Sequence, residues 1–503
     1  MPSILALDQG TTGSTALVVH QDGSVLGRSY RELAQHFPRP GWVEHDPEEI
    51  FRISVEVMRE AVAGARERPM GLGITNQRET AVLWDRRTLA PVAPAIVWQD
   101  RRTTDRCREL KETGVEPLLR ARTGLVADPY FSATKLEWLL RNPDLRRRAE
   151  RSELAAGTVE SWLVARLSGG QVHASDHTNA SRTLLYNLAT REWDPELLQI
   201  FGVPDALLPA IVSSAGVVAE TEAEHLGFAL PIAGLAGDQQ AALFGQGCCG
   251  EGLAKNTYGT GAFLLVHAGE RPPEPAEGVL ATAACGPRGE PAYALEGSVF
   301  IAGAAIQWLR DGLGLIATAQ ETDAMARTVA DTGGVHFVPA FVGVGTPHWE
   351  PNARGTITGI TRGTSRAHLV RAALEAMAFS SAELLEVMAG SGGLDVPALR
   401  VDGGASANDW LMQFQADVLG LPVERPDMVE TTALGAAGLA GIALGVWKET
   451  GDFLGGRRFR RFEPAIGEAE RRELRRGWER SVRAALAWAR SGYRGRDPQV
   501  PGT

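Results

Sequence analysis

The apolar and polar positions of this chain show one pattern twice. Residues Ile4–Val19 contain two apolar runs around the turn Asp8–Ser14, and residues Leu253–Val266 contain two apolar runs around the turn Thr257–Gly261. An apolar run, a Gly/Thr turn and a second apolar run predict a β-hairpin. Successive backbone N–H groups and Thr hydroxyls in such turns bind anions. The repeat therefore predicts either two related lobes that hold a polyphosphate between them or two ordinary hairpins.

Helical and strand patterns alternate along the rest of the chain, which indicates an α/β fold. Asp46 and Pro47 are typical of a helix start, and an apolar face follows at Ile50, Ile53, Val57 and Ala61. In the second half, Ser406 is expected to cap a helix that ends at Gly420.

Four predicted strands run directly into polar or Gly-rich clusters. These strands are 71–75, 95–98, 230–236 and 399–402. In open α/β sheets, ligands bind at the carboxyl ends of the strands. The sequence therefore predicts that these clusters together form a binding site.

The composition is that of a soluble globular protein. The chain has 503 residues, 44% of them hydrophobic and 22% charged, which predicts two domains. We place the boundary within Gly245–Gly250, giving domains 1–247 and 248–503. Four cysteines make neither a disulfide framework nor a CxxC zinc site, no apolar run has the length of a membrane span, and no signal-peptide pattern is present. We therefore expect a cytoplasmic protein without an integral membrane segment.

The charged residues argue against a nucleic-acid-binding protein and against a nucleotide-binding protein with a Walker A loop. A net charge of −10 argues against a nucleic-acid partner. Lysine occurs only at 111, 135, 255 and 448, and none of these follows a glycine. A Walker A loop needs Gly-Lys, so a nucleotide bound here would be held in another way.

Asp8 and Asp238 are the candidate carboxylates. Asp8 ends an apolar strand, where it could hold Mg²⁺ against a phosphate bound by Thr11, Thr12 and Gly13; the alternative is a turn-stabilising role. Asp238 follows a buried strand and is a candidate general base, unless it only caps the next helix.

A second group of candidates suits a small polyol. Arg78 and Glu79 place donors beside a strong acceptor, as hydroxyl recognition needs, although a surface ion pair would be favoured if the pair stood alone. Gln239 is a neutral group for hydroxyls. Trp98 and Phe263 could line the carbon skeleton or could belong to the core, and the phenol of Tyr130 could meet a hydroxyl.

A third group suits a purine or ribose. Gly403 and Gly404 precede a helix, and bare backbone at a helix start accommodates such a ligand. Asn408, Gly303 and Gln307 are further weak candidates of this group.

Taken together, these segments are similar to the FGGY carbohydrate kinases of the sugar kinase/Hsp70/actin superfamily, and among them to members that phosphorylate glycerol. The likeness extends from about residue 4 to about residue 490, and Gly73–Thr80 is its most specific part. The similar segments are Ala6–Thr12, Pro40–Pro47, Gly73–Thr80, Ile96–Thr103, Gly237–Gln246, Lys255–Gly261 and Arg400–Ala405.

The resemblance implies two RNase H-like, actin/hexokinase-type domains with the active site in a central cleft, and ATP-dependent phosphorylation of glycerol to sn-glycerol 3-phosphate. Asp238 would be the base and Asp8 would position Mg²⁺. The glycerol-binding residues would be Arg78, Glu79, Trp98, Tyr130, Asp238, Gln239 and Phe263. The residues in contact with ATP or ADP would be Thr11, Thr12, Gly13, Thr260, Gly303, Gln307, Gly404 and Asn408. A homo-oligomer, dimer or tetramer, is expected.

The chain departs from the family pattern in places. Thr15 stands where many members have an arginine, which removes a cationic phosphate contact. Residues 224–228 do not match the loop that binds fructose 1,6-bisphosphate in some bacterial members. His225 lies near a position that is phosphorylated in others, but a solvated loop histidine is the favoured interpretation.

Two alternatives remain at this point. One is a kinase for another polyol or a ketose. The other is an actin-like or Hsp70-like ATPase, which would hydrolyse ATP without a polyol and would not need Arg78, Glu79 and Trp98.

Overall fold

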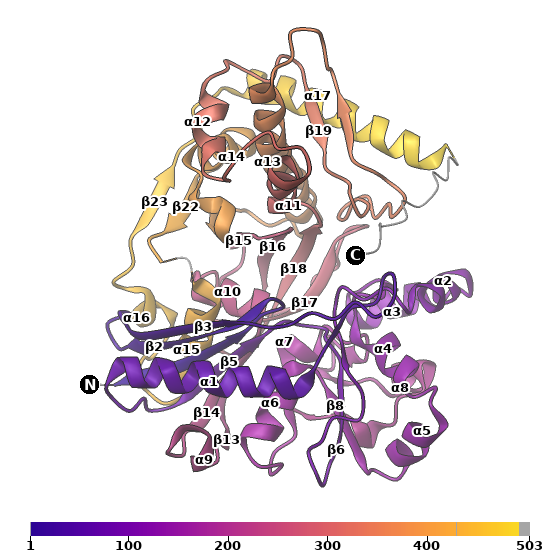
Figure 1. The fold of residues 1–503 in the computed structure, drawn as a ribbon, viewed down its shortest axis with the longest axis vertical. Coiled ribbons are helices and arrows are strands. Elements are labelled where there is room, and N and C mark those ends of the chain that lie inside the picture. The colour runs from indigo at the N-terminus through magenta and orange to yellow at the C-terminus, as the bar shows by residue number, and fades with distance from the viewer. Residues whose placement is uncertain (1, 429, 492–503) are drawn as a thin grey trace.

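The computed structural model describes residues 2–428 and 430–491. Each half of the chain is built on one mixed β-sheet (Figure 1). The first sheet has the order β13-β14-β5-β1-β2-β3 and the second has the order β17-β18-β16-β15-β21-β22-β23. The first sheet comprises β1 (Ser3–Gln9), β2 (Gly13–His20), β3 (Val25–Glu32), β5 (Leu72–Asn76), β13 (Ala215–Glu220) and β14 (Pro231–Gly237). The second comprises β15 (Ala254–Tyr258), β16 (Ala262–Gly269), β17 (Leu280–Cys285), β18 (Pro291–Val299), β21 (Leu399–Asp402), β22 (Val423–Pro426) and β23 (Phe459–Phe462).

Six strands of the second sheet repeat the order of the first, and β17 is added at its edge, so the repeat in the sequence is a repeat in the fold. In the first, β1, β2 and β3 pair antiparallel, and β1, β5 and β14 run parallel. In the second, β15, β16 and β18 pair antiparallel, and β15, β21 and β22 run parallel. Both predicted hairpins are present, as β1–β2 and β15–β16. The predicted α/β fold of two related domains is confirmed, whereas the boundary after residue 247 stays a prediction.

The helices cover the sheets. Those of the first half are α1 (Pro47–Ala65), α2 (Thr104–Glu112), α3 (Glu116–Thr123), α4 (Ser132–Leu139), α5 (Pro143–Glu150), α6 (Val159–Leu167), α7 (His177–Ala180), α8 (Pro195–Phe201), α9 (Ala223–Leu226) and α10 (Asp238–Gly245). Those of the second half are α11 (Gly303–Gln307), α12 (Glu321–Arg327), α13 (Arg366–Gly392), α14 (Asp409–Leu419), α15 (Thr431–Ala443), α16 (Thr450–Leu454) and α17 (Glu468–Arg490).

Short strands and single turns complete the description. The short strands are β4 (Glu44–His45), β6 (Val82–Asp85), β7 (Ala95–Ile96), β8 (Leu154–Gly157), β9 (Ala174–Asp176), β10 (Tyr186–Asn187), β11 (Glu192–Trp193), β12 (Ala210–Val212), β19 (His336–Val338) and β20 (Thr356–Thr358). A π-helical turn covers Trp308–Gly312, and 3₁₀ turns cover Asp205–Leu207 and Gly404–Ala407. The strand predicted at 95–98 therefore ends before Trp98.

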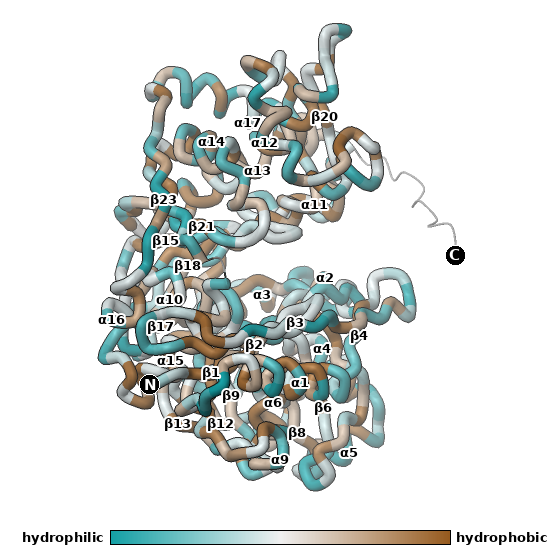
Figure 2. Tube along the Cα trace, turned by 60° about the vertical axis from the view of Figure 1, so that its left-hand side comes forward, coloured by the Kyte–Doolittle hydropathy of each residue, from teal (hydrophilic) through white to brown (hydrophobic). Residues whose placement is uncertain are grey.

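Helix α1 begins where the sequence predicts. The Asp46 side chain accepts a hydrogen bond from the Glu48 N–H at 2.9 Å, and Pro47 occupies the first turn. The expected apolar face is buried against the first sheet. Figure 2 shows hydrophobic stretches running through both halves, each of which has its own buried clusters.

Helix α15 belongs to the second half of the chain but packs on the first sheet. A Cβ atom added at Gly73 of β5 would lie 2.1 Å from the Ala436 carbonyl oxygen, so only glycine permits this approach. Helix α15 also crosses α10, which begins at Asp238. The two halves are thus joined through packed helices as well as through the chain.

The helix start predicted at Ser406 is wrong. Residues 404–407 form a 3₁₀ turn, and Asn408 caps α14 by accepting a hydrogen bond from the Leu411 N–H at 2.9 Å. In the described residues, no helix is long and apolar enough to cross a membrane.

Candidate functional site

Three candidate residues come from neighbouring parallel strands of the first sheet. Asp8 lies at the end of β1, Arg78 follows β5, and Asp238 follows β14. The register pairs Asp8 with Thr75, and Thr75 with Ala236, so the three strands end close together. The predicted gathering of polar groups at the carboxyl ends of these strands is therefore present in the fold.

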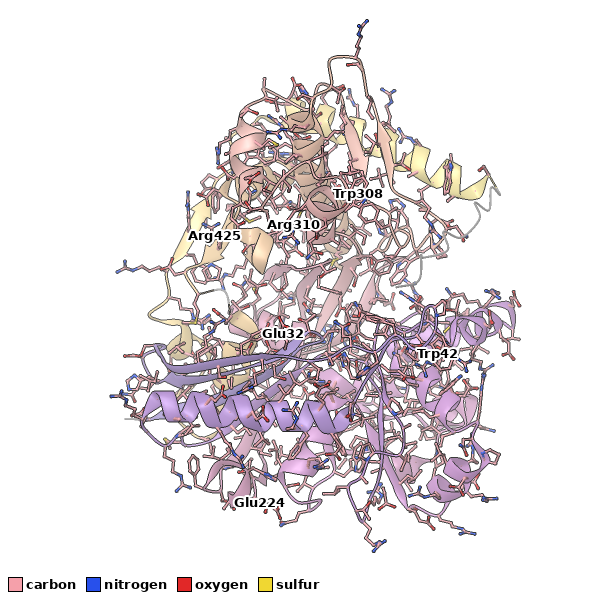
Figure 3. All side chains as sticks on the ribbon, in the orientation of Figure 1. Glu32, Trp42, Glu224, Trp308, Arg310 and Arg425 are labelled. Atoms are coloured by element: carbon pink, nitrogen blue, oxygen red, sulfur yellow. The ribbon has the colours of Figure 1, made fainter. Side chains whose placement is uncertain are left out.

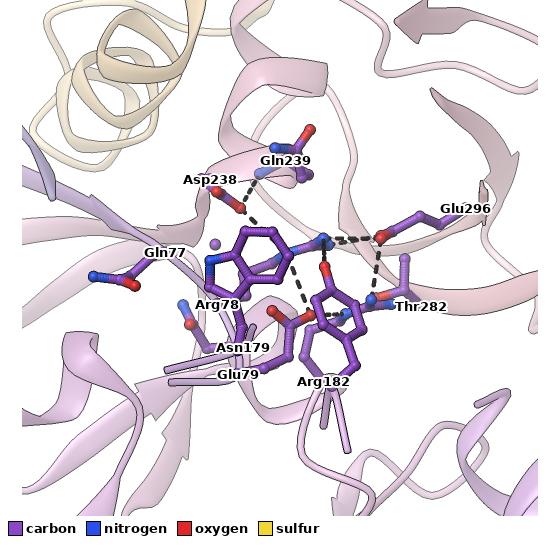
Figure 4. A network of polar contacts seen from close by, with 12 residues as sticks. Gln77, Arg78, Glu79, Asn179, Arg182, Asp238, Gln239, Thr282 and Glu296 are labelled. Carbon is purple, nitrogen blue, oxygen red and sulfur yellow. Dashed lines mark hydrogen bonds and ion pairs between the residues drawn. The ribbon is translucent and has the colours of Figure 1, made fainter. Parts of the chain in front are cut away.

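Arg78 is the centre of a buried polar network (Figure 4). Its terminal nitrogens Nη1 and Nη2 donate to the two carboxylate oxygens of Glu296 at 2.6 and 2.8 Å. Its Nε atom lies 3.2 Å from Asp238 Oδ1 and 3.7 Å from Glu79 Oε1. A surface ion pair, the alternative for Arg78 and Glu79, is wrong because both side chains are only 1% exposed.

Glu79 has a left-handed backbone conformation, with φ of 60°. Its Oε1 atom accepts a hydrogen bond from Arg182 Nε at 2.7 Å. Burial raises the pKa of the Glu79 carboxyl, and the charges of Arg78 and Arg182 oppose that rise. The carboxylate is thus an acceptor held in place by two guanidinium groups.

Asp238 is the more accessible carboxylate of the cluster, with a side chain that is 29% exposed. It is the first residue of α10, and Gly237 occupies the cap position, so Asp238 is not the helix cap. Its Oδ1 atom accepts a hydrogen bond from the Gln239 N–H at 2.7 Å. Burial raises the pKa of Asp238, and Arg78 opposes the rise.

The charge of Asp238 acts on Asp8. Burial, followed by the charge of Asp238, raises the pKa of Asp8 to about 7. A carboxyl group whose ionised form is disfavoured by a second carboxylate is suited to bind a cation, because a divalent ion would offset the repulsion and prefers oxygen ligands.

The aromatic candidates lie together beside these charges. The ring centroids of Trp98 and Tyr130 are 5.5 Å apart, and those of Trp98 and Phe263 are 6.3 Å apart, in edge-to-face arrangements. The indole N–H of Trp98 donates to the Thr11 hydroxyl at 2.8 Å, which links this wall to the turn after β1. The Tyr130 hydroxyl accepts a hydrogen bond from Arg78 at 3.4 Å.

Sequence reasoning missed three charged members of the site. Glu296 lies on β18, Arg182 follows α7, and Lys255 lies on β15; all three are fully buried. Arg182 Nη2 donates to Glu296 at 3.0 Å. Burial would raise the pKa of Glu296, but Arg182 and Arg78 outweigh it and hold that pKa at about 2. A lone charged residue inside an apolar run was the available signal for Glu296, whereas Lys255 begins the polar stretch Lys255–Thr257 and had no such signal.

Lys255 connects the second hairpin to Gln239, one of the candidate polyol-binding residues. Its Nζ atom donates to the side-chain oxygen of Gln239 and, at 2.9 Å, to the Thr257 hydroxyl. Burial lowers the pKa of Lys255 to about 8, against the opposing charges of Asp402 and Asp238. The Lys255 contact fixes the Gln239 amide so that its NH₂ group is left for another partner.

Residues 302–304 and Gly403 lie against the second turn. The Gly303 N–H donates to the Gly259 carbonyl at 3.0 Å, and the Ala304 N–H donates to the Thr260 carbonyl at 3.1 Å, so α11 starts against the turn. Gly403, with φ of 83°, passes so close to Tyr258 that an added Cβ would lie 2.4 Å from its carbonyl oxygen.

The remaining candidates are more dispersed. Nothing lies within 4 Å of a Cβ added at Gly404, and Gln307 is exposed. Asn408 Nδ2 donates to the Thr322 hydroxyl at 3.1 Å, in addition to the capping bond of its oxygen. Thr12 is exposed, and Gly13 lies against Tyr30 and Arg31 of β3.

The structure also places the residues at which the sequence departs from the family pattern. Thr15 lies on β2 opposite Asp8 in the hairpin register. The interpretation of His225 as a solvated loop histidine is wrong, because it lies on α9 with a side chain that is 12% exposed and with Nε2 at 4.0 Å from Glu222. The neighbouring Glu224 is at the outer end of the first half, on the side away from the second half (Figure 3).

Comparison with known proteins identifies the family. The N-terminal domain model of the FGGY family of carbohydrate kinases matches residues 3–245, and the C-terminal domain model matches residues 254–444. A glycerol kinase of Alkalilimnicola ehrlichii is 55% identical over 500 residues, covering 97% of this chain and 99% of that protein. A glycerol kinase of Deinococcus radiodurans is 54% identical over 491 residues, covering 96% and 98%.

A solved structure gives the same result. The crystal structure of Plasmodium falciparum glycerol kinase with ADP superposes with a TM-score of 0.91 at 34% identity, covering 97% of this chain and 98% of that one. The chain therefore belongs to the FGGY family of carbohydrate kinases.

Proposed function

We propose that this protein transfers the γ-phosphoryl group of ATP to glycerol and forms sn-glycerol 3-phosphate. One observation carries the proposal: glycerol kinases are 54% and 55% identical to the chain over nearly its whole length. The polar cluster of Arg78, Glu79 and Asp238 supports it, because three charged groups around one small space suit an acceptor with several hydroxyls.

In this proposal, glycerol lies against the aromatic wall of Trp98, Tyr130 and Phe263. Arg78 and the NH₂ group of Gln239 donate to its hydroxyl oxygens, while Glu79 accepts from a hydroxyl. Binding at fixed donors and acceptors orients one terminal hydroxyl toward the phosphate.

Asp238 is the proposed general base. It removes the proton from the terminal hydroxyl as that oxygen attacks the γ-phosphorus in line. The raised pKa of Asp238 suits this role, because a stronger base accepts a proton more readily. Since charge is spread over the γ-oxygens in a loose transition state, positioning and electrostatics supply most of the rate.

The phosphates would lie between the two turns. Thr11, Thr12 and Gly13 would bind them from the first lobe, residues 1–247. From the second lobe, residues 248–503, nucleotide contacts would come from Thr260, Gly303, Gln307, Gly404 and Asn408. The carboxylate of Asp8 would hold Mg²⁺, which neutralises phosphate charge when bound; the oxygen donors and the effect of the Asp238 charge on Asp8 fit such an ion.

The activity is tested by ADP release with glycerol, xylitol, xylulose and ribulose as acceptors, and without an acceptor. We expect glycerol to give the highest kcat/KM. Higher kcat/KM with a ketose or a larger polyol would favour a different kinase of the fold. ADP release that needs no acceptor would favour an ATPase.

Asp238→Asn tests the proposed base. The amide has the shape of the carboxylate but does not accept the proton, so kcat should fall about 10²- to 10⁴-fold, with a KM for ATP close to that of the wild type. Asp311→Asn, at an exposed aspartate in the second half, is the matched control and should leave kcat unchanged. Near-normal turnover in Asp238→Asn would remove Asp238 from the mechanism.

The protein is further proposed to be a cytoplasmic dimer or tetramer. Light scattering coupled to gel filtration measures the mass of the particle in solution.

A further inference from the structure

Glu296 has no place in the proposed chemistry, yet its contact with Arg78 at 2.6 Å is shorter than the 2.7 Å ion pair of Arg182 with Glu79. It lies on β18 of the second half, and its partners Arg78 and Arg182 come from the first half. All three side chains are at most 1% exposed. Figure 4 shows Glu296 at one side of the Arg78 guanidinium and Asp238 on another.

Glu296 determines which edge of Arg78 is free. Both terminal nitrogens of Arg78 donate to Glu296, at 2.6 and 2.8 Å. The third nitrogen, Nε, is buried and has no hydrogen-bond partner within the described residues, and its nearest ion-pair partner is Asp238 Oδ1, at 3.2 Å. Nε therefore lies beside the proposed base, where the acceptor hydroxyl would also lie in the proposed function.

Removing Glu296 would change this arrangement. A guanidinium prefers two parallel hydrogen bonds to one carboxylate. Asp238 already meets Nε through Oδ1 at 3.2 Å, so without Glu296 it is the carboxylate placed to form both bonds. A two-bond pair of Arg78 with Asp238 would occupy both the hydroxyl donor and the proton acceptor.

Arg182 keeps Glu296 from moving with Arg78 toward the bound acceptor. It holds Glu296 through Nη2 at 3.0 Å and Glu79 through Nε at 2.7 Å. Glu296 is therefore fixed between two guanidinium groups, and Arg78 cannot draw it toward the acceptor space without breaking these bonds.

We propose that Glu296 is a positioning residue of the acceptor site, which holds both terminal nitrogens of Arg78 so that the guanidinium meets Asp238 through Nε alone and does not pair with both of its carboxylate oxygens. The inference rests on the proposed function, because it gives Arg78 and Asp238 the roles described above. It adds that the second half of the chain contributes to orienting glycerol through a residue that does not touch it.

A double-mutant cycle of Glu296→Gln and Arg78→Met tests this coupling. Glu296→Gln should lower kcat/KM for glycerol at least about 30-fold, through both kcat and KM, and change the KM for ATP less than about twofold. If Glu296 acts through Arg78, the double variant should be no slower than Arg78→Met alone. The double variant also removes one charge of each sign, so it should fold even if a single variant does not.

Glu375→Gln is the control for loss of a buried carboxylate. Glu375 is 5% exposed on α13 and pairs with Arg371 at 2.9 Å, outside the proposed site. Its kinetic constants should match the wild type. Additive effects of Glu296→Gln and Arg78→Met on kcat/KM would overturn the inference. Equal effects of Glu296→Gln on the KM for glycerol and the KM for ATP would also overturn it.

A crystal structure of Glu296→Gln gives a readout that does not depend on turnover. We expect the Arg78 guanidinium to be paired with Asp238 by two hydrogen bonds; an unmoved Arg78 would also overturn the inference. Absence of wild-type turnover with glycerol would instead contradict the proposed function, and the two failures are thereby distinguished.

Discussion

At the scale of single residues, buried charges decide the character of this site. Lys255 is an example, because its ammonium group orients the Gln239 amide that is proposed to bind glycerol. Lys255→Met keeps the length of the side chain but removes the donor. We expect the KM for glycerol to rise about tenfold, because the amide is then free to turn its oxygen toward the substrate. Steady-state kinetics with varied glycerol measure this change, and an unaltered KM would contradict the assigned contact.

The same variant tests the charge of Lys255. Burial lowers the folded-state pKa to about 8 from a usual value of 10.5. Between about pH 8 and pH 10.5, Lys255 is protonated in the unfolded chain but not in the folded protein. The free energy of unfolding of the wild type should therefore rise with pH in this range. Lys255→Met should lack this rise. Denaturant titrations from pH 7 to pH 10 measure this as an increase, with pH, in the free energy of unfolding of the wild type relative to that of the variant.

Residue types alone indicated only part of the site. Arg78, Glu79 and Asp238 were predicted because they follow strands, where a polar cluster is visible in the sequence. Glu296 and Arg182 were missed because their partners are far away along the chain and no local pattern joins them. A single charged residue in an apolar strand signals an unusual environment without naming the partner that neutralises it.

At the scale of elements, the hairpin and the amphipathic helix were predictable and the helix crossing was not. Strands β1, β2 and β16 of the two hairpins have clear apolar runs, and α1 has one apolar face. Helix α15 is buried on most sides, so its sequence has no polar face that would tell which sheet it packs on. The error at Ser406 has a local cause, since the 3₁₀ turn moves the cap to Asn408.

The crossing of α10 and α15 is tested by Gly435→Ala. The added Cβ would lie 1.8 Å from the Ala241 carbonyl oxygen, a backbone atom that cannot move without shifting α10. We expect a loss of about 1–3 kcal/mol in the free energy of unfolding, as in other overpacked cores. Because α10 begins at Asp238, kcat should fall as well. Chemical denaturation and steady-state kinetics measure the two effects.

Gly390→Ala provides the comparison. Gly390 lies in α13 with no atom within 4 Å of an added Cβ, so the same substitution should be neutral or should stabilise the protein by up to about 1 kcal/mol. Equal effects at the two positions would show that the close approach at Gly435 has no energetic consequence.

At the scale of the whole molecule, the acceptor site draws on both halves of the chain. Trp98 of the first half lies 6.3 Å from Phe263 of the second half, measured between ring centroids, and Arg78 pairs with Glu296 across the same boundary. Two sheets that repeat the same order of six strands thus contribute differently. The first supplies the charged ends of its parallel strands, and the second supplies side chains of its antiparallel strands.

This division predicts how glycerol alone should act on the protein. A ligand that contacts both halves stabilises the state in which they are joined, so it should slow local opening in both. Hydrogen–deuterium exchange with and without glycerol measures this directly. We expect protection of peptides covering 76–80 in the first half and 257–264 in the second, before any nucleotide is added. Ethylene glycol at the same concentration controls for solvent effects. Protection confined to the first half would mean that Phe263 and the second hairpin join the site only after ATP binds, and the acceptor pocket would then be assembled by the nucleotide.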